Sequence, residues 1–424
     1  MKYFKKITAL IMSVIICFSM VACGSTDRNK AAKDLKLGGP VTVNVWYNDS
    51  AYESYLLNVA KEFHAANELV TINPMYVESE DYIETIYNES VKNGNVADVY
   101  LMSSEESEKA YLLGLMLEND TYKDIYNSDV YGNAGITACS YKNKLYGYPV
   151  SFNTTFMIYN KKYASAISTF SELQKINDSY VVTDDNQDVE MIFAWDPSSM
   201  FLNYTFGGKY INVGGNSAEE EKVLTVNDDK LKEAMTEYVK LKELYAVSRK
   251  EVDMNKNIDL FAKGGLMYSI IDANSLSVID SSEVSYGICA VPKLTDNLEN
   301  KSLSVTTMAV VNPYTSNIAA SKAVARAISY DYADELEENT GYLCARGDYK
   351  KTKNQEAYEE LHRIYSDSSV KAKYIGVGEL YIRYEIMLHQ IWDGTDVDTA
   401  YGTFHNAVEH LKEDQNKSAT ITVQ

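Results

Sequence analysis

The segment Leu145–Tyr163, LYGYPVSFNTTFMIYNKKY, decides the fold. Its aromatic and β-branched residues are typical of a buried strand. Ser151–Thr155 interrupts it with polar side chains, and a polar group inside a buried strand costs free energy unless it is paired. Two interpretations are open. The strand crosses from one globular lobe to another, so that its middle reaches an interlobe cleft, or it is an ordinary core strand whose Asn and Thr bind backbone groups.

Upstream of this segment, predicted strands alternate with predicted helices. The expected strands are Val41–Trp46, Val70–Val77 and Ala97–Met102, and the expected helices are Tyr52–Ala66, Tyr82–Val91 and Glu105–Leu115. This alternation predicts an α/β fold with a largely parallel sheet. In such sheets, ligands bind outside the carboxyl ends of the strands. Asn48–Ser50 and Ser103–Glu105 follow two of these strands, so they are candidate ligand-binding segments.

Length and charge narrow the possible classes of protein. A chain of 424 residues is too long for one compact core and predicts two domains or lobes. With 46% hydrophobic and 24% charged residues, the composition is that of a folded globular protein. The formal net charge of −20 repels nucleic acids and anionic membrane surfaces, so we expect no nucleic-acid partner.

The N-terminus carries a targeting pattern. Three lysines within the first six residues precede the apolar segment Ile7–Met20, and the small residue Ala22 stands before Cys23. This pattern predicts a signal peptide over residues 1–22 and, as in bacterial lipoproteins, a lipid-modified Cys23. Simple secretion with an incidental cysteine is the alternative. A lipid on Cys23 would hold the protein at the extracellular face of the cell membrane.

Residues 23–40 are polar and small, without a periodic apolar face. We expect them to be a flexible tether between the lipid and the folded body. Downstream of the signal, no apolar run approaches the length of a transmembrane helix. The protein is therefore predicted to be anchored to a membrane rather than embedded in it.

Catalytic and cofactor motifs are absent from the sequence. It has no phosphate-binding glycine loop, no His-Glu-x-x-His zinc motif and no Gly-x-Ser-x-Gly elbow, so we expect no cofactor, no metal and no catalytic residue. Apart from Cys17 and Cys23, three widely separated cysteines remain, Cys139, Cys289 and Cys344. Their odd number and spacing predict no disulfide framework, and Cys289 is expected to be a small buried apolar residue.

Four segments in order resemble the extracellular solute-binding lipoproteins of ABC importers, the family that includes maltose-binding protein. They are LYGYPV…IYNK from Leu145, FAKGGLM from Phe261, VSYGI…VP from Val284 and WDGTDVD from Trp392. The resemblance runs from about Val41 to the C-terminus. It implies a two-lobed, type II periplasmic-binding-protein-like α/β fold whose lobes are joined by crossover hinge strands and close on a ligand.

By this resemblance the chain passes between the lobes three times. The crossovers are expected near Ser151–Thr154, near Ala309–Val311 and around residues 366–370. The first lobe would comprise residues 41–152 and 312–366, and the second lobe residues 153–311 and 367–424.

The resemblance also implies ligand-binding positions in both lobes. Asn48, Asp49 and Glu105 match polar contacts of the first lobe, Asn153 a hinge position, and Asp196 an acidic position of the second lobe. Tyr381 stands at a stacking aromatic, whereas Asn274 replaces one, and Trp195 is an additional candidate platform. Carboxylates and amides pair with sugar hydroxyls, while an aromatic ring covers the apolar ring face.

The implied function is capture of a carbohydrate, a mono- or oligosaccharide, for an ABC permease by a monomeric protein that catalyses no reaction. Two alternatives remain open. Acidic cleft residues would also suit a cationic solute such as a polyamine or a basic peptide, whose affinity would depend steeply on salt. A surface glycoside hydrolase would need two carboxylates at a catalytic separation, and the 60 acidic residues single out no pair.

Overall fold

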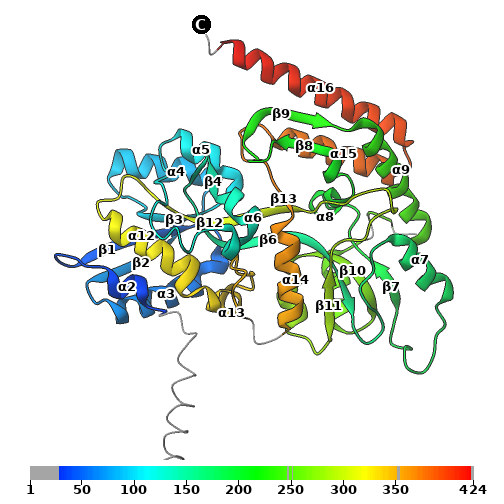
Figure 1. Ribbon diagram of the computed structural model, residues 1–424, viewed down its shortest axis with the longest axis horizontal. Coiled ribbons are helices and arrows are strands. Elements are labelled where there is room, and N and C mark those ends of the chain that lie inside the picture. The colour runs from blue at the N-terminus through cyan, green and yellow to red at the C-terminus, as the bar shows by residue number, and fades with distance from the viewer. Residues whose placement is uncertain (1–27, 246–247, 251, 351–353, 422–424) are drawn as a thin grey trace, which may run out of the picture.

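The computed structural model describes residues 28–245, 248–250, 252–350 and 354–421. Figure 1 shows two lobes side by side, with strands β6 and β12 running between them. The described strands are β1 Val41–Tyr47, β2 Val70–Tyr76, β3 Val99–Ser103, β4 Ser140–Tyr141, β5 Lys144–Leu145, β6 Tyr148–Asn160, β7 Met191–Ala194, β8 Ile211–Gly214, β9 Glu220–Val226, β10 Leu266–Asp272, β11 Tyr286–Cys289, β12 Leu303–Val311 and β13 Ser369–Val370.

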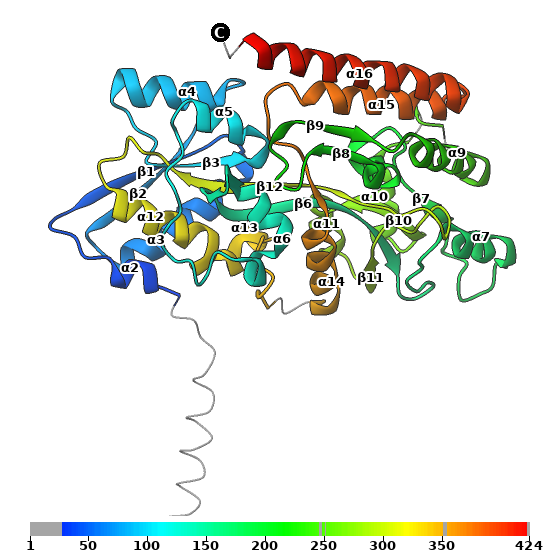
Figure 2. The same ribbon diagram turned by 45° about the horizontal axis from the view of Figure 1, so that its top comes forward.

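The helices cover both lobes and the junction between them. They are α2 Lys30–Asp34, α3 Glu53–Ala66, α4 Tyr82–Asn88, α5 Ser107–Leu112, α6 Ser128–Cys139, α7 Phe170–Ser179, α8 Met200–Asn203, α9 Asp228–Tyr245, α10 Met254–Ala262, α11 Leu276–Asp280, α12 Ile318–Arg326, α13 Leu336–Thr340, α14 Gln355–Ser366, α15 Gly378–Trp392 and α16 Val397–Ile421. In both views α16 lies along α15 at the surface of the second lobe (Figures 1 and 2).

Strand β6 changes partners halfway along its length. From Tyr148 to Thr154 it pairs with β12, and from Thr155 onward it pairs with β10 and β11, all antiparallel. The strand order is therefore β2-β1-β3-β12-β6-β10-β7, with β11 also on β6 and β13 on β12. The prediction that this segment crosses between two lobes is confirmed.

The polar residues of β6 are also paired, as the second interpretation requires. The Thr154 hydroxyl donates to the carbonyl of Leu303 at 2.9 Å, and the Thr155 hydroxyl to that of Phe201 at 3.2 Å. These bonds offset the cost of burying the two hydroxyls. Asn153 is partly buried and binds a turn of the second lobe, as described below.

The first lobe is a parallel sheet with helices on both faces. Strand β1 pairs in parallel with β2 and β3, and β12 closes this half antiparallel to β3. Alternate side chains divide between two cores: Val45 and Leu101 pack with α3 and α12, while Trp46 and Tyr100 pack with α4 and α5. This alternation is the period-2 pattern expected of strands buried on both faces.

The second lobe has an aromatic core. Trp195 stacks on Phe193 with ring centroids 4.9 Å apart, and its edge meets Trp392 at 5.3 Å. The indole N–H of Trp195 donates to Asn203 at 3.0 Å, so the buried polar atom of this ring is satisfied. The core lies between the β10–β7 half of the sheet and helices α8, α9 and α15.

Two of the three expected crossovers lie where the resemblance implies. Besides β6, strand β13 pairs with β12 at Ser369 and Val370. The crossover expected near Ala309–Val311 is wrong, because these residues pair with β3 inside the first lobe. Strand β12 instead passes to the second lobe at Leu303–Ser304, which means that the first lobe includes Thr307–Val311. The remaining lobe boundaries stay a prediction.

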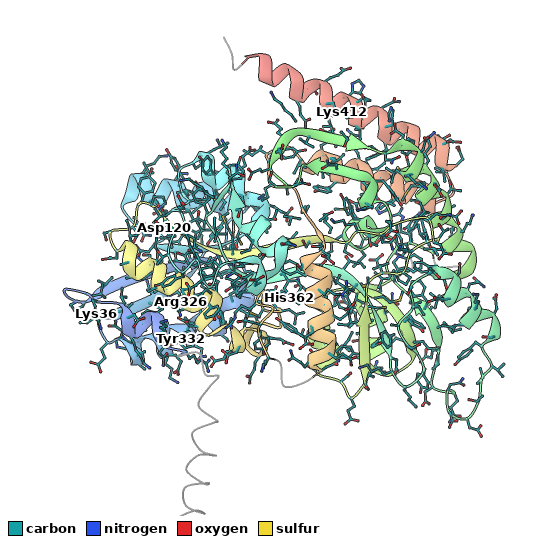
Figure 3. All side chains as sticks on the ribbon, viewed as in Figure 1. Lys36, Asp120, Arg326, Tyr332, His362 and Lys412 are labelled. Atoms are coloured by element: carbon teal, nitrogen blue, oxygen red, sulfur yellow. The ribbon has the colours of Figure 1, made fainter. Side chains whose placement is uncertain are left out.

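Helix α14 packs against the two strands that cross between the lobes. The ring of Tyr365 stacks on Phe152 of β6 at 4.1 Å, and its hydroxyl contacts that of Thr306 of β12 at 2.6 Å. One turn earlier, a ring nitrogen of His362 lies 2.8 Å from the carbonyl oxygen of Ala345, and burial lowers the pKa of His362 below its ordinary value. Figure 3 shows His362 at the junction of the two lobes.

The expected flexible tether is wrong for its second half. Helix α2 begins at Lys30, and Ala31 and Ala32 are buried in the first-lobe core. Asn67, directly after the end of α3, donates its amide to the carbonyls of Ala32 and Leu35 at 2.8 and 3.2 Å. The small alanines allow close approach, which is why a sequence without a periodic apolar face still packs. The predicted signal peptide and Cys23 lie outside the described residues.

Candidate ligand cleft between the lobes

An inner cavity of about 310 Å³ lies at the carboxyl ends of β1 and β3, where the strand rule placed the ligand. Its wall combines polar groups with the edges of buried rings. Its lining residues include Asn48, Asp49, Tyr52, Ser103, Glu106, Lys109 and Thr307. Asn48 is exposed at the end of β1, so its amide is free of the packed core.

A second, outer cavity of about 920 Å³ lies beside the inner one. Its first-lobe wall includes Glu105 and Leu112, and its second-lobe wall includes Met200, Ile375 and residues of α15 such as Tyr381 and Ile382. Glu106 and Lys109 line both cavities, so the two cavities are neighbours. Since the walls of the outer cavity come from both lobes, a molecule bound there would contact both.

Asp49 is held in place by two hydrogen bonds. Its carboxylate accepts from the backbone N–H of Ala51 at 3.0 Å and from the hydroxyl of Tyr342 at 2.8 Å. Burial, together with the neighbouring Asp49 carboxylate, raises the pKa of Tyr342 to about 12. The tyrosine thus stays protonated at neutral pH and orients Asp49 as a hydrogen-bond acceptor beside the inner cavity.

The inner cavity is tied to the crossing strand. Tyr52, which lines it, is buried, and its hydroxyl oxygen lies 2.6 Å from that of Ser151 on β6. Desolvation raises the pKa of Tyr52 above its ordinary value, so the phenol remains a neutral donor. Tyr52 therefore connects the inner cavity directly to β6, the strand that joins the lobes.

Lys109 is the cation shared by the two cavities. Its ammonium lies 2.7 Å from Glu84 and 3.9 Å from Glu106. Partial burial alone would lower the pKa of Lys109, but the bond to Glu84 and the two carboxylates outweigh it and raise the pKa. The same bond lowers the pKa of Glu84. Both groups are therefore charged at neutral pH.

Glu105 and Lys371 form an ion pair between the two walls of the outer cavity. The ammonium of Lys371 also lies 5.3 Å from the ring centroid of Tyr381. A cation over an aromatic face is attracted by the ring quadrupole. Lys371 thus covers the ring that the resemblance assigned to ligand stacking.

The two predicted aromatic platforms are both buried. Trp195 is 0% exposed in the second-lobe core, so its proposed stacking role is wrong. Tyr381 lines the outer cavity but is only 4% exposed, and its hydroxyl accepts from the backbone N–H of Ala372 at 2.9 Å. Burying the apolar surface of a large aromatic ring is favourable, which explains why both rings lie in the second-lobe core.

The other predicted second-lobe residues do not line either cavity. Asn153 donates its amide to Asp272 at 3.1 Å and accepts from the N–H of Ala273 at 2.9 Å, holding the turn after β10 that carries the exposed Asn274. Asp196 accepts from the N–H and hydroxyl of Ser198 at 2.8 and 2.6 Å. Its carboxylate therefore caps its own turn. A ligand role of these three residues stays a prediction.

Ser103 belongs to a predicted segment, whereas the charged cleft residues Glu106, Lys109 and Lys371 were not predicted. Glu106 and Lys109 had a signal, because they follow β3 and are three residues apart on one helical face. Lys371 had none, since it reaches the cleft only through the third passage between the lobes.

The third passage is fastened to the first lobe by a buried lysine. The ammonium of Lys373 donates to the carbonyls of Thr137 and Ser140 at 2.7 and 2.5 Å, and Glu219 lies 3.8 Å away. Desolvation lowers the pKa of Lys373 to about 8. Carbonyls at the end of α6 favour the cation, because a helix C-terminus carries partial negative charge.

Among the described residues, no group of three or more His, Cys, Asp or Glu side chains is arranged to hold a metal ion. Cys139, Cys289 and Cys344 are buried and free, which confirms the expectation for Cys289. Within the same part of the chain, no helix has the length and apolar character that a bilayer crossing requires.

The two-lobed sheet with a cleft between its halves defines a binding protein of the periplasmic type. Residues 58–361 match the family described as bacterial extracellular solute-binding protein. Because the match covers more than half of the chain, the protein belongs to this family of extracellular solute-binding proteins. No curated protein matches the chain.

Solved structures show the same fold at low sequence identity. A cyclo/maltodextrin-binding protein complexed with maltotetraose has a TM-score of 0.72 and 15% identity, covering 90% of this chain and 98% of its own. An extracellular solute-binding protein from Staphylococcus aureus with maltose has 0.71 and 16%, covering 91% and 100%. The maltose-binding periplasmic protein MalE from Listeria monocytogenes, also with maltose, has 0.70 and 19%, covering 89% and 98%. The predicted two-lobed α/β fold is confirmed.

Proposed function

We propose that the protein captures a carbohydrate in the interlobe cleft and delivers it to an ABC permease. One observation carries this proposal: oriented acceptors and donors from the ends of β1 and β3 line a cavity that adjoins a second cavity between the lobes. Paired hydroxyls of a sugar match such carboxylates, amides and hydroxyls. That three proteins of the same fold are solved with maltose or maltotetraose supports the choice of ligand class.

Closure would follow from the position of the cleft. A ligand that contacts Asp49 and Glu106 on one wall and α15 on the other gains more contacts when the lobes approach each other. It therefore shifts the population toward the closed form. We propose that this capture proceeds without turnover, as an importer requires an unchanged solute. Chromatography of maltotetraose after incubation with the protein should recover it intact.

A panel of sugars tests the proposal. A ligand that binds only the folded protein raises its apparent melting temperature. We expect at least one mono- or oligosaccharide in a panel that includes maltose and maltotetraose to do so, with a saturable calorimetric titration. If no sugar raises the melting temperature, the carbohydrate proposal is wrong.

A cationic solute is a second candidate because the cleft is acidic. Its lining carries six carboxylates, Asp49, Glu80, Glu84, Glu105, Glu106 and Glu385, against Lys109 and Lys371. Both lysines are engaged by carboxylates. Affinity for a polyamine such as spermidine would fall steeply with salt, whereas affinity for a neutral sugar would not. Titrations of both solutes at low and high salt separate the candidates.

We also propose that the mature protein begins at a lipid-modified Cys23 and is a monomer. The family is extracellular, and the sequence pattern before Cys23 supports this anchor. Replacement of Cys23 by Ser should release the protein from the membrane fraction into the medium. Retention of the Cys23→Ser protein in the membrane would contradict the anchor.

A further inference from the structure

The outer cavity has an unusually apolar rim. Leu112 on α5 is 64% exposed, and on the opposite wall Ile375 and Ile382 are 60% and 56% exposed. All three line the same cavity. Large aliphatic side chains from two lobes that face one cavity mark a binding surface rather than scattered surface residues.

The fold fixes the backbone positions that carry these side chains. The backbone N–H of Ile375 donates to Glu108 of α5 at 2.6 Å, which fastens the passage to the first lobe. Ile382 stands on the first turns of α15, a helix of 15 residues. Leu112 is the last residue of α5. In Figures 1 and 2, α5 belongs to one lobe and α15 to the other.

A bare sugar does not account for this rim. The apolar faces of pyranose rings are covered best by flat aromatic rings. The two tyrosines of this cavity, Tyr374 and Tyr381, are both 4% exposed, and Lys371 lies over the second ring. The accessible apolar surface is therefore aliphatic and branched, a shape that suits a flexible hydrocarbon rather than a sugar ring.

The polar and apolar cavities adjoin at Glu106 and Lys109, which line both. A molecule that spans the two cavities would place hydroxyls beside Asp49 and Asn48 and an apolar group beside Leu112, Ile375 and Ile382. We propose that the solute is amphiphilic: a glycoside whose apolar substituent occupies the outer cavity. This inference rests on the proposed carbohydrate function and adds the chemical class of the substituent.

Alkyl glycosides test the inference directly. Methyl, hexyl and octyl glycosides of glucose and maltose are titrated by calorimetry below their micelle concentrations, beside the free sugars. Burial of each methylene contributes roughly three- to fourfold in affinity. Because the outer cavity is open to solvent, we expect the octyl glycoside to bind at least about tenfold more tightly than the methyl glycoside.

Substitutions locate the effect. Ile382→Ser and Leu112→Ser should each remove most of the gain from the octyl chain, so that the ratio of octyl- to methyl-glycoside affinity falls toward one. Leu57→Ser on α3 is the matched control, because Leu57 is 54% exposed and lines neither cavity. All three side chains are exposed, so unchanged melting temperatures without ligand are expected and are measured first.

The outcomes separate the two proposals. Equal affinity for the methyl and octyl glycosides overturns the inference and leaves the carbohydrate function standing. A gain that persists in both serine variants also overturns it, because the chain then binds elsewhere. Equal weakening of both glycosides by Ile382→Ser shows an effect on lobe closure and likewise overturns it. If no sugar or glycoside binds, the proposed function itself fails, and the inference with it.

Discussion

The two walls of the cleft differ in how they are built. The polar part of the first-lobe wall includes residues at the ends of strands: Asn48 and Asp49 just after β1, and Ser103 and Glu106 at and after the end of β3. The second-lobe wall comes from the third passage and from α15, at Ile375, Ile382 and their neighbours. The turns after β7 and β10, where the resemblance placed Asp196 and Asn274, line neither cavity.

This difference shows where the strand rule holds. In the first lobe the sheet is parallel, and its strand ends open directly into the cleft. In the second lobe the turns after β7 and β10 are occupied by their own bonds, with Asp196 bound to Ser198 and Asp272 to Asn153. A later segment then covers that side of the cleft. Four substitutions test the comparison.

The largest effect is expected from Trp195→Ala. The ring lies at the centre of the second-lobe core, so its removal leaves a cavity and should lower the free energy of unfolding by about 3–5 kcal/mol. Urea denaturation measures this. The exposed Tyr314→Ala is the control and should change the free energy by less than about 0.5 kcal/mol. A stable Trp195→Ala protein with lost sugar affinity would return Trp195 to the cleft.

Glu106→Ala should weaken sugar binding most among the first-wall variants. Loss of a hydrogen bond to a charged group contributes about 1.5–3 kcal/mol, roughly ten- to hundredfold in the dissociation constant. Calorimetry with the best sugar of the panel checks this. Glu62→Ala on α3 is the matched control, because this carboxylate is similarly exposed and lines neither cavity. Unchanged affinity in Glu106→Ala would remove Glu106 from the site.

The buried Lys373, which fastens the third passage to the first lobe, makes the free energy of unfolding depend on pH. Its pKa is about 8 in the folded protein and about 10.4 when unfolded. Below pH 8 Lys373 is protonated in both the folded and the unfolded state, and burying its charge lowers the free energy of unfolding by the full amount. Between about pH 8 and 10 the unfolded state binds more protons, so the wild type gains stability as pH rises.

Compared with Lys373→Met, the wild type should therefore gain about 1–2 kcal/mol of unfolding free energy between pH 7.5 and 9.5. Comparison of the two proteins cancels the titration of groups elsewhere, and the groups facing the lysine are Glu219 and Cys139. Parallel denaturation curves at both pH values measure the difference. A constant difference would show that Lys373 stays charged throughout.

The smallest effect is expected from Lys371→Met. The Glu105–Lys371 pair is partly exposed, and such pairs contribute less than about 1 kcal/mol. Affinity for a neutral sugar should thus change by less than about fivefold. Lys240→Met, which breaks an exposed pair with Glu237, is the control. A larger loss of affinity in Lys371→Met alone would place Lys371 among the groups that bind the ligand.

Much of the fold could be predicted because its signals are local. The period-2 pattern of Val41–Trp46 and the helical pattern of Tyr52–Ala66 both correspond to elements of the structure. The hairpin β8–β9 was not predicted, because Glu220–Val226 is charged and mostly exposed and therefore lacks the alternating apolar pattern that indicates a strand. Burial of Ala31 and Ala32 was missed because small residues carry a weak apolar signal.

By itself, the sequence determined the alternation of strands and helices and the polar residues after β1 and β3, because short-range periodicity and turn chemistry specify them. It left the crossing at β6 as one of two interpretations. Only the tertiary structure decided that Trp195 and Tyr381 are buried and that Lys371 and Ile375 reach the cleft. These outcomes depend on packing between segments more than one hundred residues apart. No local sequence pattern shows whether an apolar side chain will be covered by such a distant segment or left in the cleft.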